Sequence, residues 1–237
     1  MKSKERRLYL IPSTLGNSPP EQVIPAGNLE ILQSLRCFVV EEERTARRFL
    51  IRCGFKDNLD AIHLYTLNEH TREQEIPSIF TDAGEADLGL ISEAGVPAVA
   101  DPGAKLVEVA HRLDIRVIPL AGPSSLILAL MASGLNGQCF AFNGYLPVKA
   151  HERNNRIRLY EKRSETENQS QLFIEAPYRN NQLTEAFLSN CKPGTRLCIA
   201  ANLTLDHEWI KTRSVREWRL HPPPDLKHQP AVFILLA

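Results

Sequence analysis

The stretch LGLISEAGVPAVADPG, residues 88–103, joins a short apolar run to a segment of small side chains. Residues 88–91 are typical of a buried strand. Residues 92–103 are interrupted by glycine and proline, which favour open loop backbone over a helix or a strand. In parallel α/β sheets, ligands bind where such loops leave the carboxyl ends of strands. The stretch therefore predicts a ligand-binding loop at the end of a parallel strand.

Short strands and helices alternate through the rest of the N-terminal half. Apolar runs predict strands over residues 8–11, 37–40, 61–65, 88–91 and 115–118. Helical spacing predicts helices over residues 29–35, 43–53, 68–83 (broken at Pro77) and 104–113. Alternation of this kind requires crossover connections, so we expect a mainly parallel sheet.

The second half is organised differently. Strands are expected over residues 140–145, 171–175, 196–203 and 231–236, and residues 209–220 are expected to supply a hairpin. Only two convincing helices intervene before residue 196, which favours an α+β arrangement with more antiparallel pairing. We therefore expect two domains, residues 1–120 and 121–237.

Composition narrows the function classes. The chain has 237 residues, 43% hydrophobic and 24% charged, as in ordinary globular proteins. Its 28 basic and 28 acidic side chains cancel, so any attraction to nucleic acid must be local. Five cysteines without a CxxC pair and seven histidines without ligand spacing favour neither a disulfide framework nor a metal site. No apolar run reaches membrane-spanning length, and the N-terminal run is too short for a signal segment, so we expect no membrane partner and a cytoplasmic location.

Three loops rich in small residues follow three of the predicted strands. They are residues 12–17, 92–97 and 121–125. Glycine allows backbone to approach a ligand closely, and the missing side chains leave room for it. Each loop alone is explained equally well by an ordinary turn. Together they outline a pocket for a flat or extended small molecule.

Several motifs occur in the order and spacing of a known enzyme family. They are Glu41-Glu42-Glu43-Arg44, Leu67-Asn68-Glu69, residues 92–103, residues 121–125, residues 132–135, Gly144-Tyr145-Leu146-Pro147-Val148-Lys149 and Ile174-Glu175-Ala176-Pro177-Tyr178-Arg179. In this order they resemble the tetrapyrrole-methylase superfamily of S-adenosylmethionine-dependent methyltransferases. The similarity is greatest to the branch that methylates a ribose 2′-hydroxyl in small-subunit ribosomal RNA, and it extends from Ile11 to about Glu208.

The resemblance implies an α/β, two-domain tetrapyrrole-methylase-like fold. It implies a mainly parallel sheet in the N-terminal domain, a mixed-sheet α+β C-terminal domain, a donor cleft between them and a homodimer. S-adenosylmethionine is the cofactor that it implies. Matched position by position, the donor-contacting residues are Leu15, Ser92, Gly95, Val96, Val99, Ser124, Ser125, Glu175, Asn202 and Leu203.

Three acidic residues are candidates for a catalytic base or for orienting the acceptor. Glu41 and Glu42 follow one predicted strand, and Glu69 follows the next. A ribose hydroxyl is a poor nucleophile while it is protonated, so a nearby base would assist the transfer. The alternative for each residue alone is a solvated acidic patch that pairs with neighbouring arginines.

Residues 149–163 carry the clearest local excess of positive charge. A helix would place Lys149, Arg153, Arg156 and Arg163 along one stripe, with Tyr160 among them for base stacking. Cations at this spacing could contact consecutive phosphates of ribosomal RNA. The alternative is a solvated helix face with local ion pairs. Arg44 and Arg179, each at the end of a family motif, complete the predicted substrate-binding set.

The segment Ala201-Asn202-Leu203-Thr204-Leu205 stands where the ribosomal branch carries R-E-L-T-K. Three charged positions are lost there, whereas leucine and threonine are kept. Two alternatives therefore stay open beside ribosomal RNA methylation. One is a methyltransferase acting on a tetrapyrrole or another small molecule, and the other is a donor-binding module without turnover.

Overall fold

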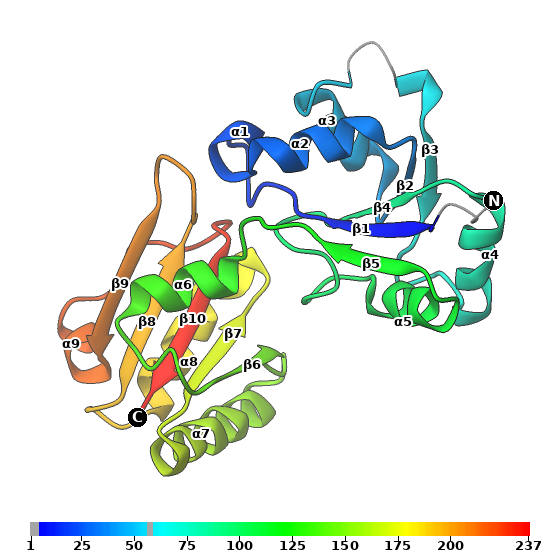
Figure 1. The fold of residues 1–237 in the computed structure, drawn as a ribbon. Coiled ribbons are helices and arrows are strands. Elements are labelled where there is room, and N and C mark those ends of the chain that lie inside the picture. The colour runs from blue at the N-terminus through cyan, green and yellow to red at the C-terminus, as the bar shows by residue number, and fades with distance from the viewer. Residues whose placement is uncertain (1–4, 56–58) are drawn as a thin grey trace. The chain divides into compact units, whose positions relative to one another are not determined.

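A computed structural model describes residues 5–55 and 59–237 of the chain (Figure 1). The chain divides into two compact units, which meet in sequence at Ser124 and Ser125. The boundary expected after residue 120 lies in the same loop, between β5 and α6. Residues 1–4, which begin the basic N-terminal segment, lie outside the described residues.

The first unit contains a five-stranded parallel sheet in the order β3-β2-β4-β1-β5. Its strands are β1 (Arg7–Ile11), β2 (Cys37–Val40), β3 (His63–Thr66), β4 (Leu88–Ile91) and β5 (Arg116–Pro119). All are parallel, so the loops after β4, β1 and β5 leave the same edge from three adjacent strands. The predicted parallel sheet is confirmed.

Helices cover both faces of this sheet. They are α1 (Pro20–Val23), α2 (Ala26–Ser34), α3 (Glu43–Arg52), α4 (Ile76–Asp82) and α5 (Ala104–Arg112), with short 3-10 turns at Leu59–Ala61 and Glu73–Glu75. Alternate residues of β1 face opposite ways: Leu8 packs in the cluster that includes α4 and α5, whereas Tyr9 and Ile11 pack in the cluster that includes α2 and α3. The continuous apolar strands follow from this two-sided burial.

One helix of the first unit differs from its prediction. Residues 68–83 form no single helix with a break at Pro77; Pro77 instead lies in the first turn of α4. The first turn has no intrahelical partner for its N–H groups, so proline costs nothing there. The helix therefore starts beside the proline.

The second unit contains a mixed sheet in the order β6-β7-β10-β8-β9. Its strands are β6 (Phe140–Tyr145), β7 (Ser170–Ile174), β8 (Arg196–Ala201), β9 (Trp209–Ser214) and β10 (Ala231–Leu236). β6 and β7 pair in parallel, and the other neighbours pair antiparallel. The mixed α+β character predicted for this half is confirmed.

The helices of the second unit are α6 (Ser125–Ser133), α7 (Ala150–Glu167), α8 (Asn180–Asn190) and α9 (Val215–Leu220), with a 3-10 turn at Pro177–Arg179. Ile157 of α7, Phe187 of α8 and Trp218 of α9 pack with Phe173 and Phe233 of the sheet. Residues 209–220 do not form the predicted hairpin by themselves. β9 instead pairs with β8, and α9 follows it in a capping box made by Ser214 and Glu217.

The described residues contain neither a membrane-spanning helix nor a cluster of metal-ligating side chains. None of their helices is long and apolar enough to cross a membrane. Their histidine, cysteine and acidic side chains form no group of three or more that could hold a metal ion.

Candidate functional site

The three small-residue loops of the first unit pack against one another. The backbone N–H of Ser13 donates a hydrogen bond of 2.8 Å to the carbonyl oxygen of Gly95, which joins the loops after β1 and β4. A Cβ atom at Gly95 would lie 3.0 Å from Leu15 Cδ2 and 3.2 Å from the carbonyl oxygen of Pro123. Gly95 is thus the point at which all three loops meet, and a glycine is required there.

The loop after β4 holds its backbone in unusual conformations. Ala98 and Ala100 have φ values of 63°, and Gly95 and Gly103 have φ values of 80° and 129°. Left-handed backbone costs an alanine roughly 1–2 kcal/mol, and such strain concentrates at functional sites. Within the described chain, the N–H groups of residues 93–96 donate no hydrogen bond. The loop therefore presents free backbone donors, as a ligand-binding loop requires.

A buried side-chain pair fixes the shape of this loop. The hydroxyl of Ser92 is buried and donates a short hydrogen bond to the carboxylate of Asp101. Burial raises the pKa of Asp101, and the hydrogen bond from Ser92 opposes that rise. The pair ties the start of the loop to its end.

Acidic side chains gather where β2, β3 and β4 end. Glu41 follows β2 and is half-buried. Burial raises the pKa of Glu41, and the negative charges of Asp101, Glu93 and Glu69 raise it further. A carboxylate with a raised pKa holds a proton more strongly, which suits a general base. Of the three predicted acidic candidates, Glu41 has the environment that fits this role.

Glu42 has a structural role instead. Its carboxylate accepts hydrogen bonds from the N–H groups of Arg44, at 2.9 Å, and Thr45, at 2.7 Å, and so caps α3. These bonds lower the pKa of Glu42. Glu69 is exposed and lies 3.7 Å from the His70 ring. The predicted trio therefore separates into one candidate base, one helix cap and one solvated carboxylate.

Replacing Glu42 by alanine should destabilise the protein, because the first N–H groups of α3 lose their acceptor. We expect the melting temperature near neutral pH to fall by a few degrees, measured by circular dichroism. The pKa of Glu42 is lowered in the folded state, so its contribution is present above the ordinary carboxyl pKa and is lost as pH falls through the lowered value. Glu43→Ala is the matched control, because the only ion pair of Glu43 among the described residues is an exposed one, at 3.8 Å from Arg47. Equal melting temperatures for both variants would contradict the capping role.

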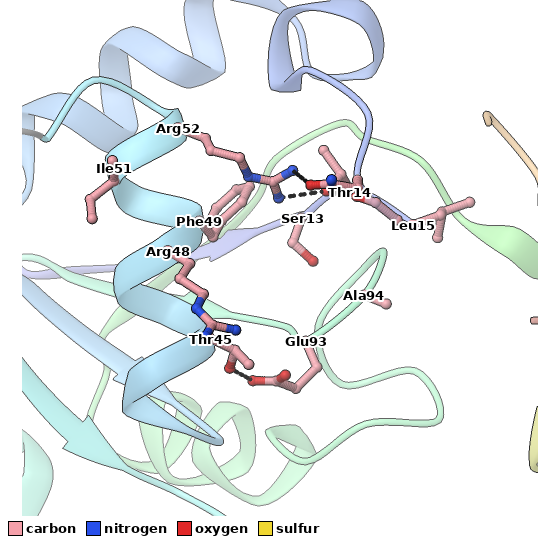
Figure 2. A pocket seen from close by; sticks show the side chains of 12 residues that line it. Ser13, Thr14, Leu15, Thr45, Arg48, Phe49, Ile51, Arg52, Glu93 and Ala94 are labelled. Carbon is pink, nitrogen blue, oxygen red and sulfur yellow. Dashed lines mark hydrogen bonds between the residues drawn. The ribbon is translucent and has the colours of Figure 1, made fainter. Parts of the chain in front are cut away.

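A cavity of about 520 Å³ opens beside these loops within the first unit (Figure 2). The loops after β1 and β4 form one wall, with Ser13, Leu15 and Ala94. The cavity-facing side of α3 forms the other and presents Thr45, Arg48, Phe49 and Arg52. The Thr45 hydroxyl donates a 2.6 Å hydrogen bond to Glu93, which joins the two walls.

In the second unit, the predicted donor residues gather at one edge of the mixed sheet. Glu175 follows β7, and Asn202 and Leu203 follow β8; all three are buried. The side-chain N–H of Asn202 donates 2.7 Å to the side-chain oxygen of Gln229, and its backbone N–H donates 2.9 Å to the carbonyl of Pro230. The segment before β10 thus holds Asn202 in place.

The backbone at this edge is also strained. Asn202 and Thr204 have φ values of 54° and 68°. The Thr204 hydroxyl is buried and has no hydrogen-bond partner among the described residues. Native proteins rarely leave such groups unpaired, so the segment is suited to complete its bonding with a ligand.

The sequence is similar to proteins of one name over most of its length. None of the family models searched matches it. The protein named ribosomal RNA small subunit methyltransferase I of Mesorhizobium japonicum is 32% identical over 213 residues, which cover 90% of this chain and 68% of that protein. This chain belongs to the ribosomal RNA small subunit methyltransferase I family. Proteins of the same name from Escherichia coli O157:H7 and a Hydrogenobaculum species are 29% and 30% identical and cover 91% and 85% of the chain; the chain spans 71% and 83% of their lengths.

Solved structures confirm the two-domain tetrapyrrole-methylase-like fold. The methyltransferase CobJ aligns with a TM-score of 0.63 at 15% identity, covering 98% of this chain and 94% of its own. The uroporphyrin-III C-methyltransferase from Thermus thermophilus, in complex with S-adenosyl homocysteine, aligns with a TM-score of 0.55 at 15% identity, covering 98% and 97%. At these identities the likeness concerns the fold alone.

In the structure of this methyltransferase I family member, the cations predicted to contact RNA differ in their exposure to solvent. Lys149 is exposed and lies 3.3 Å from Glu152, and Arg156 is exposed. Arg153 differs from its prediction: it is buried, and its guanidinium donates to the Val148 carbonyl at 3.3 Å. Tyr160 is half-buried against Phe173, with 5.3 Å between ring centroids, so it is no platform for a base.

Arg179 is engaged within the second unit. It donates to Glu175 at 2.6 and 3.0 Å, and its guanidinium lies 5.4 Å from the centroid of the Tyr178 ring. Arg44, in contrast, is exposed at the start of α3. The predicted stripe of cations is therefore not a continuous surface.

The cavity-facing residues of α3 were missed as site residues. Thr45, Arg48, Phe49 and Arg52 are spaced at i, i+3, i+4 and i+7, which places them on one helix face. This spacing was visible in the sequence. The sequence nevertheless assigns these residues no role in the site, because one sequence does not show which helix face borders a cavity.

Proposed function

We propose that this chain transfers the methyl group of S-adenosylmethionine to a ribose 2′-hydroxyl of small-subunit ribosomal RNA. The observation that carries the proposal is the 32% identity to a protein named for this class of reaction, over 90% of the chain. A cytoplasmic location, expected from the sequence, and a homodimer, implied by the family resemblance, are part of the proposal.

The residues of both units fit a methyl donor. In the first unit, unpaired N–H groups at residues 93–96 and the close packing at Gly95 provide fixed backbone donors beside small side chains. In the second unit, the unpaired Thr204 hydroxyl provides a further polar group, beside the left-handed backbone at Asn202. We propose that Leu15, Ser92, Gly95, Val96, Val99 and Ser124 of the first unit and Ser125, Glu175, Asn202 and Leu203 of the second contact the donor.

The reaction requires the ribose oxygen, the methyl carbon and the sulfur to be held in line, and it requires one proton acceptor. A sulfonium donor supplies an activated methyl group and leaves as a neutral thioether. The ribose oxygen forms its bond to the methyl carbon while the carbon–sulfur bond breaks, and the electron pair stays on sulfur. Glu41 accepts the hydroxyl proton in this proposal. Fixed loops hold the reactants in line, and alignment of this kind contributes up to about 7–11 kcal/mol to lowering a barrier.

The test uses the purified full chain with S-adenosylmethionine labelled in its methyl group. We expect label to enter small-subunit ribosomal RNA from a strain that lacks the gene. We also expect the labelled nucleotide to resist alkaline hydrolysis, because that cleavage needs a free 2′-hydroxyl. RNA from the parent strain is the control, since its site is already methylated.

Other outcomes would favour the alternatives. Label entering a tetrapyrrole or another small metabolite in an extract of the same strain would establish a small-molecule acceptor. Donor binding by calorimetry, without transfer to any fraction of the extract, would establish a binding module. No binding of S-adenosylmethionine or of its demethylated product would contradict every form of the proposal.

A further inference from the structure

The cavity of the first unit contains two guanidinium groups without a carboxylate partner among the described residues. The guanidinium of Arg48 makes no hydrogen bond or ion pair with any described residue. Among the described residues, the Arg52 guanidinium donates only to neutral oxygens: the Thr14 hydroxyl at 3.0 Å, and Asn17 Oδ1 and the Ser18 carbonyl at 3.3 Å. Both point from α3 toward the cavity (Figure 2). Their positive charge is therefore available to an anion.

A buried hydroxyl on the opposite wall points to a ligand independently of the charges. Ser13 is 3% exposed, and its Oγ has no hydrogen-bond partner among the described residues. Figure 2 shows this hydroxyl directed into the space that Arg48 and Arg52 face. A buried hydroxyl that stays unpaired is costly, so a ligand oxygen at this point would satisfy it.

The space continues past Arg52. A second cavity, of about 390 Å³, is lined by residues 17–21 with Ile51 and Arg52. The two cavities share Asn17, Ile51 and Arg52. A groove that passes over an arginine from one hollow to the next suits an extended chain with a repeated negative charge, rather than one compact anion.

The polar groups along the groove match those of a nucleotide. Guanidinium groups bind phosphate through paired N–H donors, and they also stack on bases. Glu93, held by Thr45 at the far end of the first cavity, is an acceptor for the hydroxyl and amino groups that ribose and bases carry. A groove with two arginines along it and a carboxylate acceptor in each cavity, Glu93 in the first and Glu21 in the second, therefore fits a ribonucleotide strand.

We propose that this groove holds single-stranded RNA next to the methylated nucleotide, with Arg48 and Arg52 on successive backbone phosphates and Ser13 on a phosphate oxygen. The inference rests on the proposed function and names the surface through which the RNA is held. In this proposal the arginines that contact RNA lie on α3, whereas the sequence predicts RNA-contacting cations on the segment that forms α7.

The test compares Arg48→Gln and the double variant Arg48→Gln/Arg52→Gln with the control Arg47→Gln. Arg47 lies on the same helix and pairs with Glu43 outside the cavity lining. Binding of a small-subunit RNA fragment is measured by fluorescence anisotropy over a range of salt concentrations. We expect the double variant to bind about tenfold or more weakly and its salt dependence to fall, because each lost phosphate contact removes about 0.7 from the slope. Arg47→Gln should bind as the wild type does.

Two further measurements test the proposal even if Arg52→Gln disturbs the fold. One is RNA binding by the Ser13→Ala variant, and the other is the affinity of the variants for S-adenosylmethionine. Ser13→Ala removes an unpaired buried hydroxyl, so its melting temperature should not fall, whereas RNA binding should weaken severalfold. Affinity for S-adenosylmethionine, measured by calorimetry, should stay within twofold in Arg48→Gln and Ser13→Ala. Loss of donor affinity would assign the cations to the donor carboxylate and overturn the proposal. Unchanged RNA affinity and salt slope would overturn it too.

These outcomes separate the groove from the proposed function. If the wild type transfers no methyl group but its RNA binding depends on Arg48, the result would support the RNA groove and contradict the proposed function. Methyl transfer to RNA by variants with wild-type affinity would contradict the groove and leave the function standing. A wild type that binds no RNA would overturn the groove directly.

Discussion

Replacing Gly95 by valine should weaken donor binding strongly. Gly95 has a φ of 80°, which a β-branched residue tolerates poorly, and its Cβ would already lie 3.0 Å from Leu15 and 3.2 Å from the Pro123 carbonyl. The larger side chain forces the loops after β1, β4 and β5 apart. We expect the free energy of unfolding to fall by about 2–4 kcal/mol through backbone strain and overpacking. Affinity for S-adenosylmethionine should fall about 100-fold or more, roughly 3 kcal/mol.

Gly84→Val is the matched control for this substitution. Gly84 also has a left-handed backbone, with a φ of 57°, but a Cβ there would meet nothing within 4 Å. It precedes β4, at the opposite edge of the sheet from the three loops. Gly84→Val should therefore lose stability and keep wild-type donor affinity by calorimetry. If Gly95→Val and Gly84→Val bound the donor equally well, the packing of the three loops at Gly95 would not shape the donor site.

The strands of the first sheet could be predicted because their signal is local. Residues 37–40 and 88–91 are apolar throughout, and they are buried on both faces of the parallel sheet. The three small-residue loops after β1, β4 and β5 could be predicted for the same reason. Glycine and proline mark them in the sequence itself.

The orientation of α7 could not be predicted, because its buried face lacks an apolar pattern. Arg153, Ile157, Glu161 and Ser164 are its buried residues. Glu161 is satisfied from outside the helix, by the Thr195 hydroxyl at 2.5 Å and the Lys192 N–H at 2.7 Å. Hydrophobic periodicity therefore gives no sign of which side faces the sheet. The predicted stripe of Lys149, Arg153, Arg156 and Arg163 follows the positive charges and crosses the buried face at Arg153.

The role of α3 was hidden for a different reason. Its apolar positions correctly indicated a helix packed on the sheet, and Ala46, Phe49 and Leu50 are buried. Whether Arg48 and Arg52 face water, acidic neighbours or a cavity depends on loops more than thirty residues away in the chain. Only the assembled unit shows that these arginines and Ser13 line one space.

Replacing Glu41 by glutamine should slow methyl transfer about 100-fold or more and leave donor affinity unchanged, because a general base contributes roughly 10²–10⁴-fold. The substitution keeps the size of the side chain and removes its ability to accept the proton. In the wild type, the transfer rate under single-turnover conditions should rise with pH as Glu41 loses its proton. The pKa of that limb should lie above the ordinary carboxyl value, since burial and the neighbouring carboxylates raise the pKa of Glu41. The limb should be absent in Glu41→Gln.

Stability should change in the opposite direction from activity in this variant. Because the pKa of Glu41 is raised on folding, its ionised form is disfavoured in the folded state, and stability is lost as pH rises through the raised value. Glu41→Gln removes that charge from beside Asp101, Glu93 and Glu69, so its melting temperature at neutral pH should equal or exceed that of the wild type. Glu42→Ala should show the reverse, with lower stability and little loss of transfer per folded molecule. If Glu41→Gln kept wild-type transfer rates, the carboxylate would be a member of a solvated acidic patch, and the reaction would proceed without a protein base at this position.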